Sequence, residues 1–300
     1  MNALPDTPGV TLTADYLLSL RHRARRMPSP SLSDNTLPGG MVNRRRGRGL
    51  EAADIRHFVE GDDVRLIDRN ATARTGELHV RTLHDERDRT ALLMADFRPS
   101  MLWGTRRAFR SVAAAEALTL LGWRIVAAGG RVALMAFGAG EPVIVTPRGR
   151  DRGMSAVIGG LVRAHRLALD RTGVSDGPLT DTLDLARRVT PMGSSVFLAS
   201  ALDDPGDLNG TAGREAFGAL DHRCPLTVLR IRDAFEVAAP EGTYPFRLAT
   251  GETRVARLRE PDRLDDADRI LRDWRIDVID LDASQPLRRM ADTLGHADVG

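Results

Sequence analysis

The most pointed chemical feature of the sequence is an aspartate at the end of an apolar run. Asp96 closes the stretch ALLMAD, and Ser100 follows it in the segment FRPSM. Open α/β sheets bind ligands beyond the carboxyl ends of their strands, and an aspartate with a nearby hydroxyl can hold a hard cation there. The same two side chains can instead cap the turn into the next helix. The spacing is therefore compatible with a cation site and equally with a purely structural cap of the turn.

A second set of potential metal ligands lies between residues 79 and 86. The stretch 78–83 alternates in the manner of a strand, so His79 and His84 would point to opposite faces. A metal site needs ligands that converge on one point. We therefore favour structural roles for this set, which consists of His79, His84, Asp85 and Glu86.

Arginine clusters occur at residues 21–26 and 44–48 and could bind phosphate or an anionic membrane surface. The second cluster carries no interleaved aromatic residues, and several acids follow it closely. A solvated loop, or a partner for those acids within the chain, is the favoured interpretation. We expect no binding to nucleic acid.

Composition excludes several enzyme classes. All 43 Lys+Arg residues are arginine, so a P-loop, a Schiff-base lysine and a pyridoxal phosphate site are ruled out. The sequence has no HExxH, GxSxG or CxxC motif, and its lone Cys224 fits a reducing compartment. The formal net charge is only +2. We expect a protein that is not an enzyme.

The sequence also favours a cytoplasmic location. Its first residues lack the positive region of a signal peptide. The longest apolar stretch, residues 112–128, contains Glu116 and Arg124, which predicts a core helix and no transmembrane segment.

Strands that alternate with helices predict an α/β fold with a doubly wound, mostly parallel sheet. The expected domains are residues 1–88, an N-terminal part packed on the sheet, and residues 89–300, the α/β domain. Residues 142–146 should form an antiparallel edge strand. The predicted helices are 12–26, 109–128, 153–170, 179–189, 214–222 and 262–274, and the other predicted strands are 63–68, 78–83, 91–96, 131–137, 195–200, 226–231 and 276–281.

Three stretches of the chain resemble a bacterial family. Residues 46–82 are similar to its pattern of G-x-G, G-D-D-x-R-x-I-D and L-x-V-R. Residues 86–104, ERDRTALLMADFRPSMLWG, resemble its E-R and D-x-S-x-S-M segment, and residues 127–138 resemble its third block. The family is the domain-of-unknown-function 58 (DUF58) family.

This resemblance implies a von Willebrand factor A-like (vWA-like) sheet preceded by a family-specific signature segment. It also implies an adaptor that works with a MoxR-type AAA+ ATPase, with other vWA-like proteins as further possible partners. Many members carry N-terminal membrane helices, which are not predicted here.

The sequence departs from the family's metal-ion-dependent adhesion site at three positions. The first serine of D-x-S-x-S is Arg98, whose guanidinium has no lone pair to give a cation. The expected Gly-Thr pair is Gly177-Pro178, with Thr180 only nearby, and the expected Ser-Asp is Ser200-Ala201. Asp203 and Asp204 follow and could move in.

We therefore expect a non-enzymatic vWA-like interaction protein with a degenerate metal site and no cofactor, in which Arg98 replaces the cation by pairing with Asp96. Two alternatives stay open. One is a vWA domain that binds Mg²⁺, and the other is a nucleic-acid or membrane-surface binder that uses the arginine clusters. The expected interaction face comprises Asp96, Arg98, Ser100, Thr180 and Asp203. The signature segment either braces this face or simply forms a buried charge network. Its residues are Arg56, Asp62, Asp63, Arg65, Asp68 and Arg74.

Overall fold

A computed structural model of the chain divides into two compact units, one formed by residues 1–33 and 90–300 and the other by residues 34–89. The residues it describes are 7–27, 52–59, 64, 67–83, 90–138, 140–171, 177–203, 205–208, 210–237, 241–247, 253–258 and 264–296.

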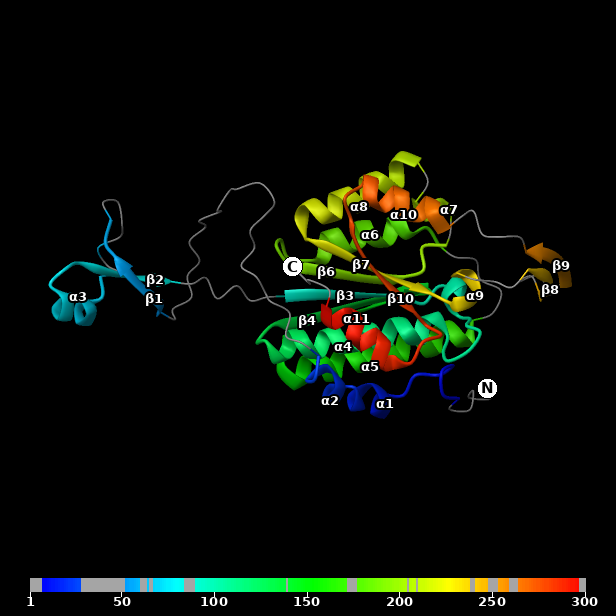
Figure 1. Cartoon of the computed structure of the whole chain (residues 1–300), viewed down its shortest axis with the longest axis horizontal. Helices are drawn as coiled ribbons and strands as arrows, with labels where there is room; N and C mark the ends of the chain where they lie inside the picture. The colour runs from blue at the N-terminus through cyan, green and yellow to red at the C-terminus, as the bar shows by residue number, and fades with distance from the viewer. Residues whose placement is uncertain are drawn as a thin grey trace. The chain divides into compact units, whose positions relative to one another are not determined.

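The larger unit is built on a six-stranded sheet with the order β10-β7-β6-β3-β4-β5 (Figure 1). Five strands are parallel, and β5 pairs antiparallel with β4 at one edge. The predicted mostly parallel sheet and its antiparallel edge strand are confirmed. The strands are β3 (Thr90–Asp96), β4 (Arg131–Gly138), β5 (Gly140–Gly149), β6 (Ser195–Ser200), β7 (Leu226–Arg232) and β10 (Asp277–Asp282).

Helices cover both faces of this sheet (Figure 1). One layer consists of α4 (Arg110–Ala127), α5 (Arg150–Asp170) and α11 (Leu287–His296), and the other consists of α6 (Leu179–Val189), α8 (Gly210–Arg223) and α10 (Leu264–Asp273). Because both faces are covered, the central strands must be apolar on both sides. In β3, Leu93 packs into the core under the first layer and Leu92 into the core under the second. The larger unit is therefore a three-layer α/β/α sandwich.

Helix α4 is the buried core helix that its sequence predicts. Its two charged interior residues both find partners, since Arg107 binds Glu116 and Arg124 donates to the carbonyl of Leu294 at 2.6 Å. Within the described residues, none of the helices is long and apolar enough to cross a membrane.

The N-terminal helices α1 (Ala14–Ser19) and α2 (Arg21–Ala24) belong to the larger unit. Leu17 and Leu20 are buried in the core of the first layer. The hydroxyl of Tyr16 also donates to Glu116 of α4. The expected domain boundary between residues 88 and 89 stays a prediction; helices α1 and α2 pack with the sheet, and the second unit is assigned to residues 34–89. The packing of that second unit on the sheet stays a prediction.

The smaller unit contains an antiparallel pair, β1 (Ala52–His57) with β2 (His79–Leu83), and a short helix, α3 (Arg69–Thr75). The strand expected over 63–68 does not form in the part that is described. Val64 lies in a 3-10 turn, and Ile67 makes a single bridge to Val80. Asp68 then caps α3 by accepting from the N–H groups of Asn70 and Ala71, and this cap ends any extended run.

Several short elements were not expected from the sequence. A two-stranded hairpin, β8 (Gly242–Arg247) with β9 (Thr253–Leu258), follows β7 and pairs only within itself in the described structure. The remaining unexpected elements are η2 (Pro99–Met101), α7 (Pro205–Leu208), α9 (Ala234–Val237) and the C-terminal α11.

A buried histidine between α4 and α5 makes the stability of this unit sensitive to acid. His165 is 1% exposed, its Nε2 lies 3.0 Å from the hydroxyl of Ser111, and burial lowers its pKa to about 4. An unfolded chain would bind a proton at this position below about pH 6.5. The folded chain does so only near pH 4, so this contribution to stability is lost as the pH falls through that window. We predict a loss of about 3 kcal/mol in the free energy of unfolding between pH 6.5 and 4 from His165 alone.

Urea denaturation at a series of pH values measures this loss. His165→Gln should flatten the pH dependence, whereas His222→Gln, at an exposed histidine of α8, should keep the wild-type slope. An unchanged slope in His165→Gln would contradict the prediction.

Candidate functional site

Asp96 lies where the direction of strand connection reverses. It ends β3, which has β4 on one side and β6 on the other. Ser200 ends the neighbouring β6, and its hydroxyl donates to Asp96 Oδ2 at 2.6 Å. This position is the switch point at which open α/β sheets bind ligands. The structure thus places Asp96 where the sequence predicted a site, and adds Ser200 to it.

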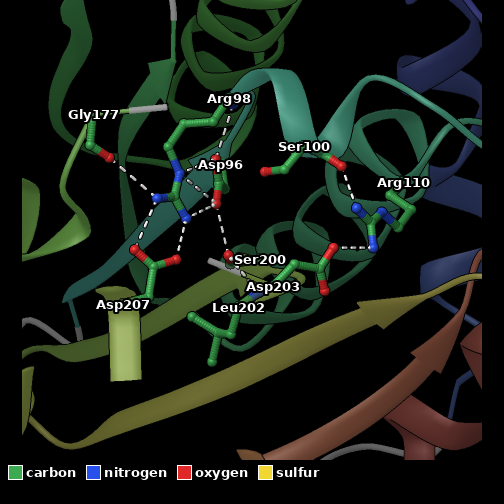
Figure 2. Close-up of polar contacts among 9 residues, drawn as sticks. All are labelled: Asp96, Arg98, Ser100, Arg110, Gly177, Ser200, Leu202, Asp203 and Asp207. Atoms are coloured by element: carbon green, nitrogen blue, oxygen red, sulfur yellow. Dashed lines mark hydrogen bonds and ion pairs between the residues drawn. The ribbon is translucent and has the colours of Figure 1, made fainter. Parts of the chain in front are cut away.

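The side chain of Arg98 fills the space between two buried carboxylates (Figure 2). Its Nε lies 3.1 Å from both oxygens of Asp96, and its Nη2 lies 2.8 Å from Asp96 Oδ2 and 2.7 Å from Asp207 Oδ2. Its Nη1 donates to Asp207 Oδ1 at 2.9 Å and to the carbonyl of Gly177 at 3.2 Å. The three charged side chains are at most 3% exposed.

This arrangement uses the full donor capacity of the guanidinium. An arginine carries five N–H donors, and the two carboxylates with the Gly177 carbonyl accept from all three of its nitrogens. Burial by itself lowers the pKa of Arg98. The hydrogen bonds to Asp207 and the charge of Asp96 outweigh that effect and raise the pKa above its ordinary value. The guanidinium is therefore a permanent charge.

The residues at this site do not fit a divalent cation. Mg²⁺ requires near-octahedral oxygen ligands, but the oxygens of Asp96 are engaged by Arg98 and Ser200. At about 4 Å, repulsion between a divalent ion and the guanidinium would be on the order of 8 kcal/mol at an effective dielectric of 20. Elsewhere in the described part of the chain, no group of three or more His, Cys, Asp or Glu side chains could hold a metal ion.

A second buried arginine lies beside the first. Arg110, at the start of α4, binds Asp203 at 2.6 Å and also binds Glu236 and the carbonyl of Ser100. Its guanidinium lies 4.5 Å from the centre of the Trp103 ring. Burial raises the pKa of Glu236, and the nearby charge of Asp203 adds to the rise while Arg110 opposes it.

The loop after β6 is held between these two arginines. The backbone N–H of Leu202 donates to the hydroxyl of Ser200, Asp203 binds Arg110, and Asp207 in α7 binds Arg98 (Figure 2). Leu202 is 5% exposed and has a φ of +56°. A bulky residue rarely adopts this left-handed conformation unless its surroundings impose it.

Not every expected member of the face joins the site. Asp203, placed on the expected interaction face, pairs with Arg110. Thr180 lies half-buried in the first turn of α6, and its hydroxyl makes no hydrogen bond within the described residues. Ser100 contributes its carbonyl to Arg110. Asp204 lies outside the described residues.

Asp207 is the residue of this buried ion-pair site that the sequence analysis missed. It lies seven positions after the end of β6, beyond Asp203 and Asp204. One clue was in the sequence, because a buried arginine at position 98 needs acceptors beyond Asp96. Spacing alone could not choose among the three aspartates of 203–207.

The signature segment is only partly described. Asp68 is buried and caps α3, and Arg74 is exposed on the same helix. Arg56 lies in β1, but its side chain is outside the described structure, as are Asp62, Asp63 and Arg65. The arginine cluster at 44–48 and residues 84–86 also lie outside it. In the described part, His79 Nδ1 lies 2.7 Å from the carbonyl of Glu77, which fits the structural role expected for it.

Comparison with known proteins adds a family and distant relatives. The model of the family "Protein of unknown function DUF58" matches residues 54–256. Uncharacterized proteins of Mycobacterium tuberculosis and Mycobacterium bovis are 36% identical over 91 residues, which is 29% of this chain and 29% of the length of each relative. The crystal structure of an aerotolerance-related membrane protein from Bacteroides fragilis superposes with a TM-score of 0.39 at 14% identity, and covers 69% of this chain and 99% of that one.

Removing the guanidinium should strongly destabilise the larger unit. Arg98→Ala leaves Asp96 and Asp207 as neighbouring buried carboxylates, and breaking a buried pair from one side costs about 3–5 kcal/mol. Urea denaturation of the full chain measures this cost. The matched control Arg187→Ala, at an exposed arginine paired only to Asp184 within the described residues, should change stability by about 1 kcal/mol or less. Equal stability of the two variants would mean that Arg98 does not hold the site together.

Proposed function

The chain belongs to the DUF58 family, and from this premise we propose that it is a non-enzymatic protein-interaction module with a degenerate metal site. In this proposal Arg98 occupies the position of the cation that a vWA-type adhesion site would bind. The partner is a MoxR-type AAA+ ATPase, as the resemblance to the family implies.

The observation that carries the proposal is the enclosure of the Arg98 guanidinium. A bound metal ion with a free coordination position can accept an oxygen from a partner protein. Arg98 has both Nη atoms and its Nε engaged inside the protein, so it has no donor left to offer. Recognition of a partner would then depend on the surface around the site and would be independent of divalent cations.

The chemistry of the reactive side chains supports a non-catalytic role. Cys224 is buried, and burial raises the pKa of its thiol. A thiol in such surroundings is a poor nucleophile at neutral pH. His165 is buried and neutral, with Ser111 as its hydrogen-bond partner. Within the described structure, no nucleophile, base and orienting group come together in the manner that covalent catalysis requires.

Titration with metal tests the first half of the proposal. Calorimetry with Mg²⁺ or Mn²⁺ should show no one-site binding to the wild-type chain, because a guanidinium fills the site. Arg98→Ser restores a hydroxyl oxygen and leaves two free carboxylates. We predict that Mg²⁺ or Mn²⁺ raises the thermal midpoint of Arg98→Ser by several degrees and leaves the wild-type midpoint unchanged. Micromolar binding to the wild type that Asp96→Ala abolishes would overturn this part.

Copurification tests the second half. The tagged full-length chain should retain a MoxR-type ATPase from the same genome equally well in EDTA and in Mg²⁺, with nucleotide held constant. Asp203→Arg places a positive charge beside Arg110 on the exposed part of the proposed face and should weaken retention at least tenfold, whereas Asp184→Arg on the outer side of α6 should not. The experiment is repeated with the ATPase free of nucleotide. If the chain then retains the ATPase only when a divalent cation is present, the proposal of a cation-independent surface is contradicted.

A further inference from the structure

A cavity lies at the end of β4 that is far from the Asp96 site, and the proposed function assigns no role to it. Its volume is about 740 Å³, and three segments line it: the N-terminal helix α2, the end of α4 and the beginning of α5. Gly149, one of its lining residues, pairs with Arg131 at the start of β4, whereas Asp96 pairs with Phe137 near the end of that strand. The cavity and the Asp96 site are thus separated by the length of β4. The lining residues are Arg21, Arg25, Trp123, Val126, Ala127, Gly149, Arg150, Asp151 and Arg152.

The charge of this cavity is strongly positive. Four arginines line it against one aspartate, so its formal net charge is +3. Asp151 is already committed, because both of its oxygens bind Arg21, at 2.8 and 2.9 Å. The three remaining guanidinium groups, on Arg25, Arg150 and Arg152, are exposed and have no acceptor within the described residues.

One wall of the cavity is fixed. Arg21 lies over the ring of Trp123, 4.8 Å from its centre, while its fork binds Asp151. Trp123 is 5% exposed, and its indole N–H is buried without an acceptor in the described part of the chain. A buried donor without a partner is uncommon in folded proteins. This donor is inaccessible to solvent, so the fixed wall is formed by the Arg21–Asp151 pair on the ring.

The backbone at the start of α5 adds donors. This helix has 21 residues, and its N-cap Gly149 provides no side-chain hydrogen bond to the first turn. Arg150 has a φ of +58°, in the left-handed region that residues other than glycine seldom adopt. The first N–H groups of a helix have no acceptor within the helix. Such groups beside several arginines favour anions, phosphate above all, because the planar guanidinium binds two phosphate oxygens at once.

We propose that this cavity is a binding site for a small phosphate-bearing anion. Arg25, Arg150 and Arg152 contact the phosphate oxygens, and the Arg21–Asp151 pair on Trp123 forms the fixed wall behind them. The ligand contacts residues at the end of α2 and at the start of α5, so its binding stabilises the packing of the N-terminal helices on the rest of the larger unit. Its phosphate belongs either to a soluble polyphosphate compound or to an anionic lipid headgroup.

Calorimetry on the full-length chain with inorganic phosphate, pyrophosphate and tripolyphosphate at constant ionic strength tests the site. We expect one-site binding that strengthens with the number of phosphates. Arg150→Gln with Arg152→Gln should weaken tripolyphosphate binding at least tenfold, and Arg25→Gln, at the C-cap of α2, should weaken it independently.

The matched control removes the same charge from the same helix. Arg163→Gln with Arg166→Gln changes two exposed arginines of α5 that do not line the cavity, and it should bind as the wild type does. Equal losses in the two double variants, or no binding of any probe, would overturn the proposal. All the substitutions are at exposed side chains, and circular dichroism verifies that each variant is folded.

Vesicle sedimentation distinguishes the two sources of phosphate. The ligand is a lipid headgroup if the chain binds phosphatidylglycerol vesicles and two conditions hold. The double variant Arg150→Gln with Arg152→Gln must abolish this binding, and tripolyphosphate must compete with it. Tripolyphosphate binding without vesicle binding would identify a soluble ligand. Vesicle binding that both double variants lose equally, without binding of any soluble probe, counts against the site.

Discussion

The pairing of Arg98 with Asp96 and Asp207 joins three segments that are distant in the sequence: the end of β3, the short α7 and the stretch before α6 that carries Gly177. Each partner depends on the others, because an isolated charge at this depth would be strongly disfavoured. Two carboxylates face one guanidinium, and the hydroxyl of Ser200 supplies a further donor to Asp96. The carboxyl edge of the sheet is thus organised by a covalently attached cation whose position is set by the fold.

The second arginine extends this organisation outward. Arg110 holds Asp203 and Glu236, so the loops after β6 and β7 are both tied to the first turn of α4. Leu202, with its left-handed backbone, lies between Ser200, which binds Asp96, and Asp203, which binds Arg110. A surface whose loops are held in this way is pre-organised, and binding to it costs little conformational entropy.

Sequence reasoning identified the elements whose pattern is set locally. The strands at 195–200 and 226–231 and the helix at 179–189 were found because apolar runs and their stops are explicit. The Arg98–Asp96 pair followed from two residues that are nearly adjacent. Asp207 was missed because its role depends on where a loop returns, which spacing does not encode. The described residues of the expected strand at 63–68 do not form one, because Asp68 caps a helix that the alternation of side chains does not predict. The hairpin β8–β9 was missed because its strands pair with each other and not with the main sheet.

The borders of the six-stranded sheet restrict how this molecule can assemble. At one border, β5 runs against its neighbour and carries Pro142 and Pro147, which lack the N–H group that an incoming strand would need. At the other border, β10 carries three aspartates in six residues, Asp277, Asp280 and Asp282. Charges and prolines at edges discourage strand pairing between molecules. Lateral growth of the sheet into fibrillar aggregates is therefore opposed at both ends, and a neighbouring protein gains little from adding a strand to this fold.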